Sequence, residues 1–333
     1  MTETVKLKDI AEKLQVSVVT VSNALSGKKG VSDAVRGEVM KTAREMGYNI
    51  TKYEKKETDG VKIGVIVSEK YLEVGISFYW AMYQQVAYAA SKKHSFTMFE
   101  ILEKHIKGRR ELPKVLREDS IDGLLVIGRM EPQYVERILA ASKVPVVLLD
   151  FYQEGLPCDA VMSNNYIGMY KATRYLLERG HRDVAFVGSV KATDNIMERY
   201  CGFRKALEEW GLPIREEWKI EDRDIESGDI HIELPENMPT AFVCNSDFTA
   251  GHLYDLLREY GYRVPEDISI VAYDNYLYGH PFANELTTYN VDMEKMAKAA
   301  VHILLKKIKR KDVHQGVRWI DSEIIERNSV KTL

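Results

Sequence analysis

Apolar residues near the N-terminus recur at helical spacing and are interrupted by two short polar turns. Leu7, Ile10 and Leu14 fall on one face, which indicates an amphipathic helix over residues 7–14. Serines stand before the next two apolar segments, where a side-chain oxygen can cap a helix. The pattern therefore predicts two more helices, over residues 18–25 and 32–46, with Ser17 and Ser32 as their N-caps.

Residues 48–60 are polar and lack a hydrophobic period, so we expect them to form a linker. Beyond them, continuous apolar runs alternate with amphipathic segments. Strands are expected at 61–67, 95–101, 124–127, 146–149, 184–188, 240–244 and 268–273. Helices are expected near 78–93, 109–118, 132–142, 166–180, 196–210, 248–261 and 293–309. This alternation is typical of doubly wound α/β domains.

The number of these units is large for one open sheet, so two similar lobes are the simpler packing. The expected fold class is a small all-α helix-turn-helix head followed by an α/β body of two doubly wound lobes. The head with its linker spans residues 1–60, and the body spans residues 61–333. A boundary between the lobes is expected near residues 158–162, after the fourth strand.

Charge is distributed unevenly along the chain. The 333 residues are 45% hydrophobic and 29% charged with a net charge of -3, which excludes a wholly basic nucleic-acid coat and a charged disordered chain. Residues 1–56 contain 11 Lys or Arg against 7 Asp or Glu, and the rest contain 36 against 43. The chain is therefore a basic head on an acidic body.

Signals for metals, disulfides and membranes are missing from the sequence. The three cysteines are far apart and form no CxxC pair, so neither a zinc cluster nor a disulfide framework is indicated, and no metal or cofactor is expected. The N-terminus has no apolar signal core, and no window approaches 18 uninterrupted apolar residues. We expect a cytoplasmic protein with no membrane partner.

A helix, a three-residue turn and a second helix form the geometry that places one helix in the DNA major groove. The second helix is expected to turn Val18, Val19, Ser22 and Asn23 outward, where valines can contact thymine methyl groups and the amide can pair with adenine. The residues expected to contact phosphates, through hydroxyl groups or positive charge, are Ser17, Thr20, Lys28, Lys29, Ser32 and Arg36. A helical bundle used only for dimerisation is the alternative.

Polar side chains follow the carboxyl ends of the expected strands, where open α/β sheets bind ligands. The candidates for effector binding are Phe78, Asp150, Asn164, Arg199, Asn245, Asp274 and Tyr276. Carboxylates accept pairs of hydroxyl hydrogens, Arg and Asn donate to oxygens, and aromatic rings can stack on a sugar. Because Asp and Asn at strand ends are also ordinary caps, Asn165 and Asp247 are expected to be caps only.

Residues 7–25, LKDIAEKLQVSVVTVSNAL, together with Val31-Ser32 and Gly47-Tyr48, resemble the DNA-binding head of the LacI-type bacterial repressors. In the body, residues 145–150, 180–188, 198–203, 239–245 and 264–274 resemble the effector domain of that family, which is like the periplasmic sugar-binding proteins. The resemblance implies a homodimeric transcription regulator, a repressor, that reads a roughly palindromic operator in double-stranded DNA and responds to a small effector. It also places Asp150, Arg199, Asn245 and Asp274 at the family's usual effector positions.

The resemblance further implies three crossings between the lobes, near residues 160–163, 290–292 and 320. Lobe one would then comprise about 61–160 plus 291–320, and lobe two about 161–290 plus 321–330. Closure of the lobes on a ligand would change the angle between the two heads of a dimer. Helices beginning near Ser77 and near Phe248 are candidates for the dimer face.

Several positions depart from the family pattern. Lys6 stands where the family usually has a Thr or Ser cap, and Asn23 stands where Arg or Lys is common, which favours adenine over guanine. Asn164 stands where the family often has Asp. The linker segment ITKYEKKE, residues 50–57, lacks the Pro and the wedge Leu of the family's hinge helix. We expect its lysines, Lys52, Lys55 and Lys56, to bind phosphates without kinking the DNA strongly.

The sequence lacks the common motifs of catalytic and nucleotide-binding sites. No GxGxxG, Walker A, GxSxG or HExxH motif is present, and hydroxyl binding explains the strand-end carboxylates without a reaction, so an enzyme is not expected. A sugar-binding protein without a DNA role would leave the head unexplained. The abundance of carboxylates favours a polyhydroxyl effector, a sugar above all, and a purine or nucleoside effector is the alternative.

Overall fold

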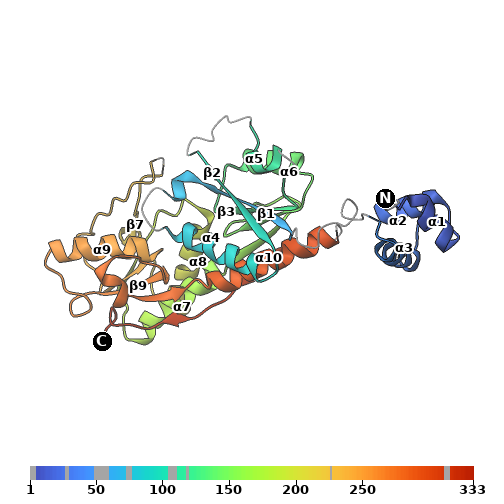
Figure 1. Ribbon diagram of the computed structural model, residues 1–333. Coiled ribbons are helices and arrows are strands. Elements are labelled where there is room, and N and C mark those ends of the chain that lie inside the picture. The colour runs from blue at the N-terminus through green and yellow to red at the C-terminus, as the bar shows by residue number, and fades with distance from the viewer. Residues whose placement is uncertain are drawn as a thin grey trace. The chain divides into compact units, whose positions relative to one another are not determined.

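The computed structural model describes residues 5–26, 30–48, 60–72, 77–103, 111–117, 120–225, 227–310 and 316–333. The chain divides into two compact units, Met1–Gly60 and Val61–Leu333, which are described separately (Figure 1). Within the described residues, no helix combines the length and the apolar character needed to cross a membrane. No group of three or more His, Cys, Asp or Glu in this part of the chain is arranged to hold a metal ion.

The head unit contains, in its described residues, the helices α1 (Leu7–Leu14), α2 (Val18–Ser26) and α3 (Asp33–Glu45). They enclose a small core that includes Ile10, Val21 and Val39, all fully buried. Each pair of these helices is in contact, as a helix-turn-helix requires. The helical periodicity of the sequence therefore predicted this unit correctly.

Short-range hydrogen bonds fix the ends of the head helices. The backbone N–H of Lys6 donates to the Asp9 carboxylate at 2.7 Å, so Asp9 closes the start of α1 although the Lys6 side chain makes no cap bond. The Ser17 hydroxyl accepts from the Thr20 N–H at 3.0 Å and caps α2. Gln15, in the left-handed region at φ 54°, makes the sharp turn between α1 and α2.

The body unit contains two sheets of six strands each in the described residues. The first sheet has, in spatial order, β11 (Val317–Ile320), β5 (Asp159–Ser163), β4 (Val146–Leu149), β3 (Gly123–Ile127), β1 (Lys62–Ser68) and β2 (Phe96–Leu102), all parallel. The second has β12 (Ile324–Ile325), β10 (Thr287–Asn290), β9 (Ser269–Asp274), β8 (Ala241–Cys244), β6 (Val184–Val187) and β7 (Lys219–Ile220). Only β12 among these strands runs antiparallel to its neighbour.

Helices cover both faces of each sheet (Figure 1). The first sheet lies between α4 (Phe78–Ser91) with α10 (Met293–Lys309) and the helices α5 (Lys114–Arg117) and α6 (Pro132–Ala141). The second lies between α7 (Asn165–Glu178) with α8 (Asp194–Glu209) and the helix α9 (Asp247–Glu259). The inner strands β1, β3, β4, β6, β8 and β9 are buried on both faces, which is why their sequences are nearly continuous apolar runs. The expected doubly wound lobes are present.

The chain passes between the two sheets at three places. It leaves the first sheet after β5, returns to it after β10 through α10, and leaves it again after β11. Because β5 pairs with β4 and β11, the first lobe extends through Ser163 rather than ending at residue 160. The strands β5, β7, β10, β11 and β12 were not expected from the sequence, because β7 and β12 have two residues each and polar residues interrupt the apolar run in the other three. The helix expected at 109–118 is described only as Lys114–Arg117.

Candidate functional site

One face of α2 presents the residues expected to read DNA. Val18 is 42% exposed and Val19 is 66% exposed, whereas Val21 is fully buried on the opposite face. Ser22 and Asn23 are partly exposed. Both valines are therefore available to contact an apolar group outside the head.

The residues expected to contact the DNA backbone differ in their surroundings and in whether the structure describes them. Ser17 and Thr20 pair through their hydroxyl groups at 2.8 Å at the start of α2, and Ser32 caps α3 by accepting from the Val35 N–H. Arg36 is half-buried on α3. Lys28 and Lys29 lie outside the described residues, as do the linker lysines Lys52, Lys55 and Lys56.

Arg199 occupies the centre of a polar cluster between the sheets. It projects from α8 and is 6% exposed. Its guanidinium donates to the Asn165 side-chain oxygen at 2.9 Å and to the Asn245 carbonyl at 2.6 Å, and it lies 3.4 Å from the Asp274 carboxylate. It also lies 3.8 Å from the ring centre of Tyr273. A buried guanidinium held on several sides is a rigid donor.

Two aspartates end the central strands of the two lobes and face this cluster. Asp150 follows β4 at φ 66°, and Asp274 ends β9 at φ 121°, both unusual backbone conformations for residues other than glycine. Burial raises the pKa of Asp150 to about 6, although the Arg199 charge and a hydrogen bond from Tyr79 act in the opposite direction. Burial also raises the pKa of Asp274 to about 7 against the Arg199 charge, and the nearby Asp150 adds to the rise. Protonated and ionised carboxyl groups are therefore both accessible near neutral pH.

Asp150 forms hydrogen bonds to residues of both lobes, and one of its carboxylate oxygens has no hydrogen-bond partner among the described residues. Its Oδ2 accepts from the Tyr79 hydroxyl at 2.9 Å in its own lobe, and its carbonyl accepts from the Asn195 amide of lobe two at 3.2 Å. Its Oδ1 is buried without a hydrogen-bond partner among the described residues. Because a buried acceptor without a donor is costly, this atom is a natural contact for a ligand. A cavity of about 40 Å³ lies beside it, lined by Tyr71, Tyr79, Arg129 and Asn195 among others.

Two aromatic rings also meet across the lobes. Phe78, at the start of α4, lies with its ring centre 6.0 Å from that of Tyr276, which follows β9, at an interplanar angle of 82°. The backbone N–H of Tyr276 donates to the buried Asp247 carboxylate at 2.7 Å. Asp247 also accepts from the Thr288 hydroxyl, so it positions the loop after β9 instead of capping α9, a role taken by Ser246. The expectation that Asp247 is a cap was wrong.

The two neighbouring asparagines at the start of α7 have roles opposite to those expected. Asn164 is the helix cap, accepting from the Ile167 N–H, and its amide donates to Asp321 at 2.7 Å where the chain leaves the first sheet. Asn165 is fully buried and binds both Arg199 and Glu198. The expectation that Asn165 is only a cap was wrong, because a cap occupies the residue before the first helical one.

Asn245 contributes its backbone to the cluster and its side chain to the scaffold. Its amide donates to the Asp222 carboxylate at 2.7 Å and to the Val187 carbonyl at 3.0 Å. Asp222, fully buried, also accepts from Arg223, which holds the pKa of Asp222 well below its usual range despite burial. Asn195 and Asp222 were not expected at the site, because neither of them directly follows an expected strand.

The chain matches models of two families in succession. Residues 6–49 match "Bacterial regulatory proteins, lacI family", and residues 173–330 match "Periplasmic binding protein-like domain". Over 338 aligned residues the chain is 30% identical to the HTH-type transcriptional repressor PurR of Vibrio parahaemolyticus, covering 98% of this chain and 99% of that protein. The chain belongs to the LacI family.

Solved structures of LacI-family proteins share this fold over nearly the whole chain. The transcriptional regulator CelR in its cellobiose complex aligns with a TM-score of 0.68 at 22% identity, covering 98% of this chain and 99% of that one. The lac repressor dimer bound to operator and the anti-inducer ONPF aligns with a TM-score of 0.67 at 22% identity, covering 99% of this chain and 100% of that one. At this identity the likeness concerns the fold.

Membership of the LacI family confirms the main expectation from the sequence. The protein is a DNA-binding transcriptional repressor of the cytoplasm and not an enzyme. The helix-turn-helix head and the periplasmic-binding-protein-like body are the two parts of such a regulator.

Proposed function

We propose that this LacI-family repressor binds a planar nitrogen heterocycle, a purine base or a nucleoside, between its two lobes. The observation that carries the proposal is the pair Phe78 and Tyr276, whose rings meet from opposite lobes. Phe78 directly precedes Tyr79, which binds Asp150, and Tyr276 follows Asp274 by two residues. The two rings touch each other in this structure, so a flat base inserts between them only when the lobes first move apart, and it then stacks on one ring from each lobe. Aromatic stacking on a base contributes about 1–3 kcal/mol.

The polar groups of the cleft suit the edge of a purine. A carboxyl group with a pKa near neutrality can donate or accept a proton in a hydrogen bond, as ring nitrogens and exocyclic amino groups require. Arg199 supplies a permanent donor between the two carboxyl groups. The matched curated relatives carry the name PurR, which denotes purines, and this agrees with the same ligand class.

A sugar is the second candidate. The buried Asp150 Oδ1 without a partner is the acceptor that a sugar hydroxyl would satisfy, and CelR is a structural neighbour solved with cellobiose. The two candidates differ in what the aromatic pair does. A base needs both rings, whereas hydroxyl groups need the carboxylates above all.

For DNA, we propose a homodimer that presents two α2 helices to a roughly palindromic operator. Val18, Val19, Ser22 and Asn23 read base edges, and Ser17, Thr20, Lys28, Lys29, Ser32 and Arg36 contact phosphates. Candidate dimer surfaces are exposed apolar side chains on β2 and α9, namely Phe96 at 59%, Ile101 at 51% and Phe248 at 43%. Size-exclusion chromatography with light scattering measures the assembly state.

A thermal-shift screen decides between the effector classes, since a ligand that binds the folded state raises the melting temperature. Adenine, guanine and their nucleosides form one arm, and glucose, ribose and cellobiose form the other. We expect a purine to raise the melting temperature and to change operator affinity in fluorescence anisotropy. Tyr276→Ala should abolish the purine shift, whereas the exposed neighbour Tyr278→Ala should preserve it. A shift with sugars alone would contradict the heterocycle and support the second candidate.

A further inference from the structure

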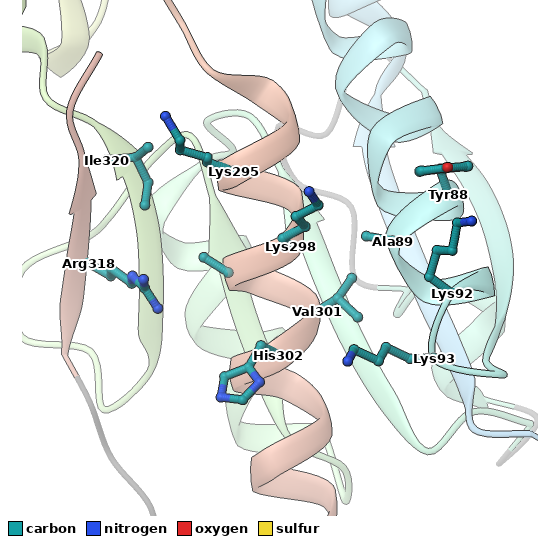
Figure 2. Close-up of a pocket in the computed structure, with 11 residues that line it drawn as sticks. Tyr88, Ala89, Lys92, Lys93, Lys295, Lys298, Val301, His302, Arg318 and Ile320 are labelled. Atoms are coloured by element: carbon teal, nitrogen blue, oxygen red, sulfur yellow. The ribbon is translucent and has the colours of Figure 1, made fainter.

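A second cavity lies in lobe one, outside the cleft between the lobes. Its volume is about 560 Å³, within the range of small-molecule sites. It is formed by α10, the C-terminal end of α4 and the strand β11 (Figure 2). None of the residues that form the polar cluster around Arg199 lines it. The cavity is therefore a separate feature from the proposed effector site.

The lining of this cavity is strongly basic. Its charged or titratable side chains are Lys92, Lys93, Lys295, Lys298, His302 and Arg318, and no lining residue is acidic. Figure 2 shows that they come from both sides of α10, with Lys92 and Lys93 at the end of α4 and Arg318 on β11. The chain as a whole has a net charge of -3, so its overall composition does not explain why so many cations surround one cavity. We name this feature the basic pocket.

Part of this charge has no internal partner. Lys295 pairs with Asp292 at 2.7 Å and Lys298 with Glu294 at 2.5 Å, so their charges are balanced within α10 and its cap. Lys93 and Arg318 have no carboxylate partner within 4 Å among the described residues. Like charges held around one cavity repel, and an anion that enters it relieves this repulsion.

The floor of the basic pocket is apolar. Ala89, Ala299, Val301 and Ile320 are buried and lie beneath the charged rim. The ring of Tyr88, with Lys92 above it at 5.1 Å, forms one wall. A cavity with this floor can take the carbon skeleton of a ligand while the rim binds its charged groups. Simple inorganic counterions would use the rim alone.

We propose that the basic pocket binds a small organic phosphate that carries more than one negative charge, as a second ligand site of this repressor. Phosphate suits the rim because each group carries up to two charges and several acceptor oxygens. Lys92, Lys93 and Arg318 have no carboxylate partner among the described residues, and they contribute positive charge from the two sides of α10. Lys295 and Lys298 supply further donors.

Isothermal titration of the full chain with inorganic pyrophosphate, at an ionic strength held constant with potassium chloride, tests this site. Lys93→Ala and Arg318→Ala should each weaken binding by about tenfold, because each removes one positive charge from the lining of the pocket. Arg258→Ala is the matched control, since it removes one exposed positive charge from α9 in the other lobe. Its affinity for pyrophosphate should equal that of the unchanged protein.

Citrate, a tricarboxylate, distinguishes phosphate recognition from attraction to any polyanion. We expect citrate to bind more weakly than pyrophosphate under the same conditions. The proposal is overturned if pyrophosphate does not bind, if citrate binds equally well, or if Arg258→Ala weakens binding as much as the pocket variants. It is also overturned if the pocket variants keep full affinity, since the anion would then be held elsewhere, for example by the basic head.

Discussion

The Arg199 guanidinium lies 3.4 Å from the Asp274 carboxylate, and both are largely shielded from water. The same guanidinium donates to the Asn245 carbonyl, so it ties α8 to the ends of β8 and β9. Arg199 therefore belongs to the scaffold of lobe two and to the proposed effector site together. A substitution at position 199 therefore affects both the stability of lobe two and the proposed effector site.

Arg199→Ala is expected to preserve operator binding and to abolish the effector response. It should also lower the free energy of unfolding by about 3–5 kcal/mol, because it leaves the Asp274 carboxylate buried without its cation. Arg204→Ala, on the exposed side of the same helix, removes a surface pair with Glu208 and should cost about 0.5 kcal/mol or less. Urea denaturation gives the stabilities, and anisotropy with labelled operator gives the response. A normal response in Arg199→Ala would place the effector elsewhere.

The raised pKa values of Asp150 and Asp274 predict a pH dependence of stability without ligand. A folded-state pKa above the ordinary value of 3.8 means that the folded protein holds protons the unfolded chain has released. Their stabilising contribution is complete below pH 3.8 and is lost as the pH rises through about 6 and 7. For Asp150 this amounts to about 3 kcal/mol. The two contributions do not simply add, because the Asp150 charge is one cause of the raised pKa of Asp274.

Asp150→Asn should flatten the fall in stability between about pH 4 and pH 7, measured by urea denaturation at each pH. Asp267→Asn is the control. Hydrogen bonds from Arg263 lower the pKa of Asp267 to about 2, so its contribution is lost only as the pH falls toward that value. The slope above pH 4 should stay unchanged in this variant. An equal slope in Asp150→Asn and the unchanged protein would show that Asp150 is not a buried titrating group.

The sequence predicted best those features that a local pattern encodes. The strand Val146–Leu149 was expected with its bounds, because four enclosed apolar residues end at Asp150, where the chain turns. Arg199 was identified through its resemblance to the family motif and through its place after a strand–loop segment. Ser17 and Ser32 were correct as caps, since capping depends only on the next three residues.

Features that depend on distant contacts could not be predicted in the same way. The partner of Asp150 is Tyr79, 71 residues earlier, and that of Arg199 is Asn165, 34 residues earlier. Asn164 and Asn165 are equivalent in any local pattern, and only the start of α7 decides which one caps and which one is buried. The basic pocket likewise includes both Lys93 and Arg318, which are 225 residues apart in the sequence and line one cavity only because α4 and β11 both pack beside α10.

The backbones of α7 and α8 lie close together at Gly202. A Cβ added there would lie 2.1 Å from the Tyr166 carbonyl oxygen, a backbone atom that cannot move aside without shifting α7. Gly202→Ala should therefore lower the free energy of unfolding by about 1–3 kcal/mol, despite the better helix propensity of alanine. Cys201→Ala, its exposed neighbour on α8, should change stability by about 0.5 kcal/mol or less. Equal stabilities of the two variants, measured by urea denaturation, would contradict the close packing.

Asn23 is the residue of α2 from which we expect direct discrimination between bases. Its amide can donate to and accept from the major-groove edge of adenine, so Asn23→Ala should relax specificity at one base pair of each half-site by about 1–3 kcal/mol. The measurement is a competition titration of the operator against all its single-base variants at fixed salt. Lys13→Ala, which removes an exposed charge from α1, should leave the order of preference unchanged. If Asn23→Ala keeps the full preference at every position, base recognition rests on the valines and on DNA shape, and the adenine contact does not exist.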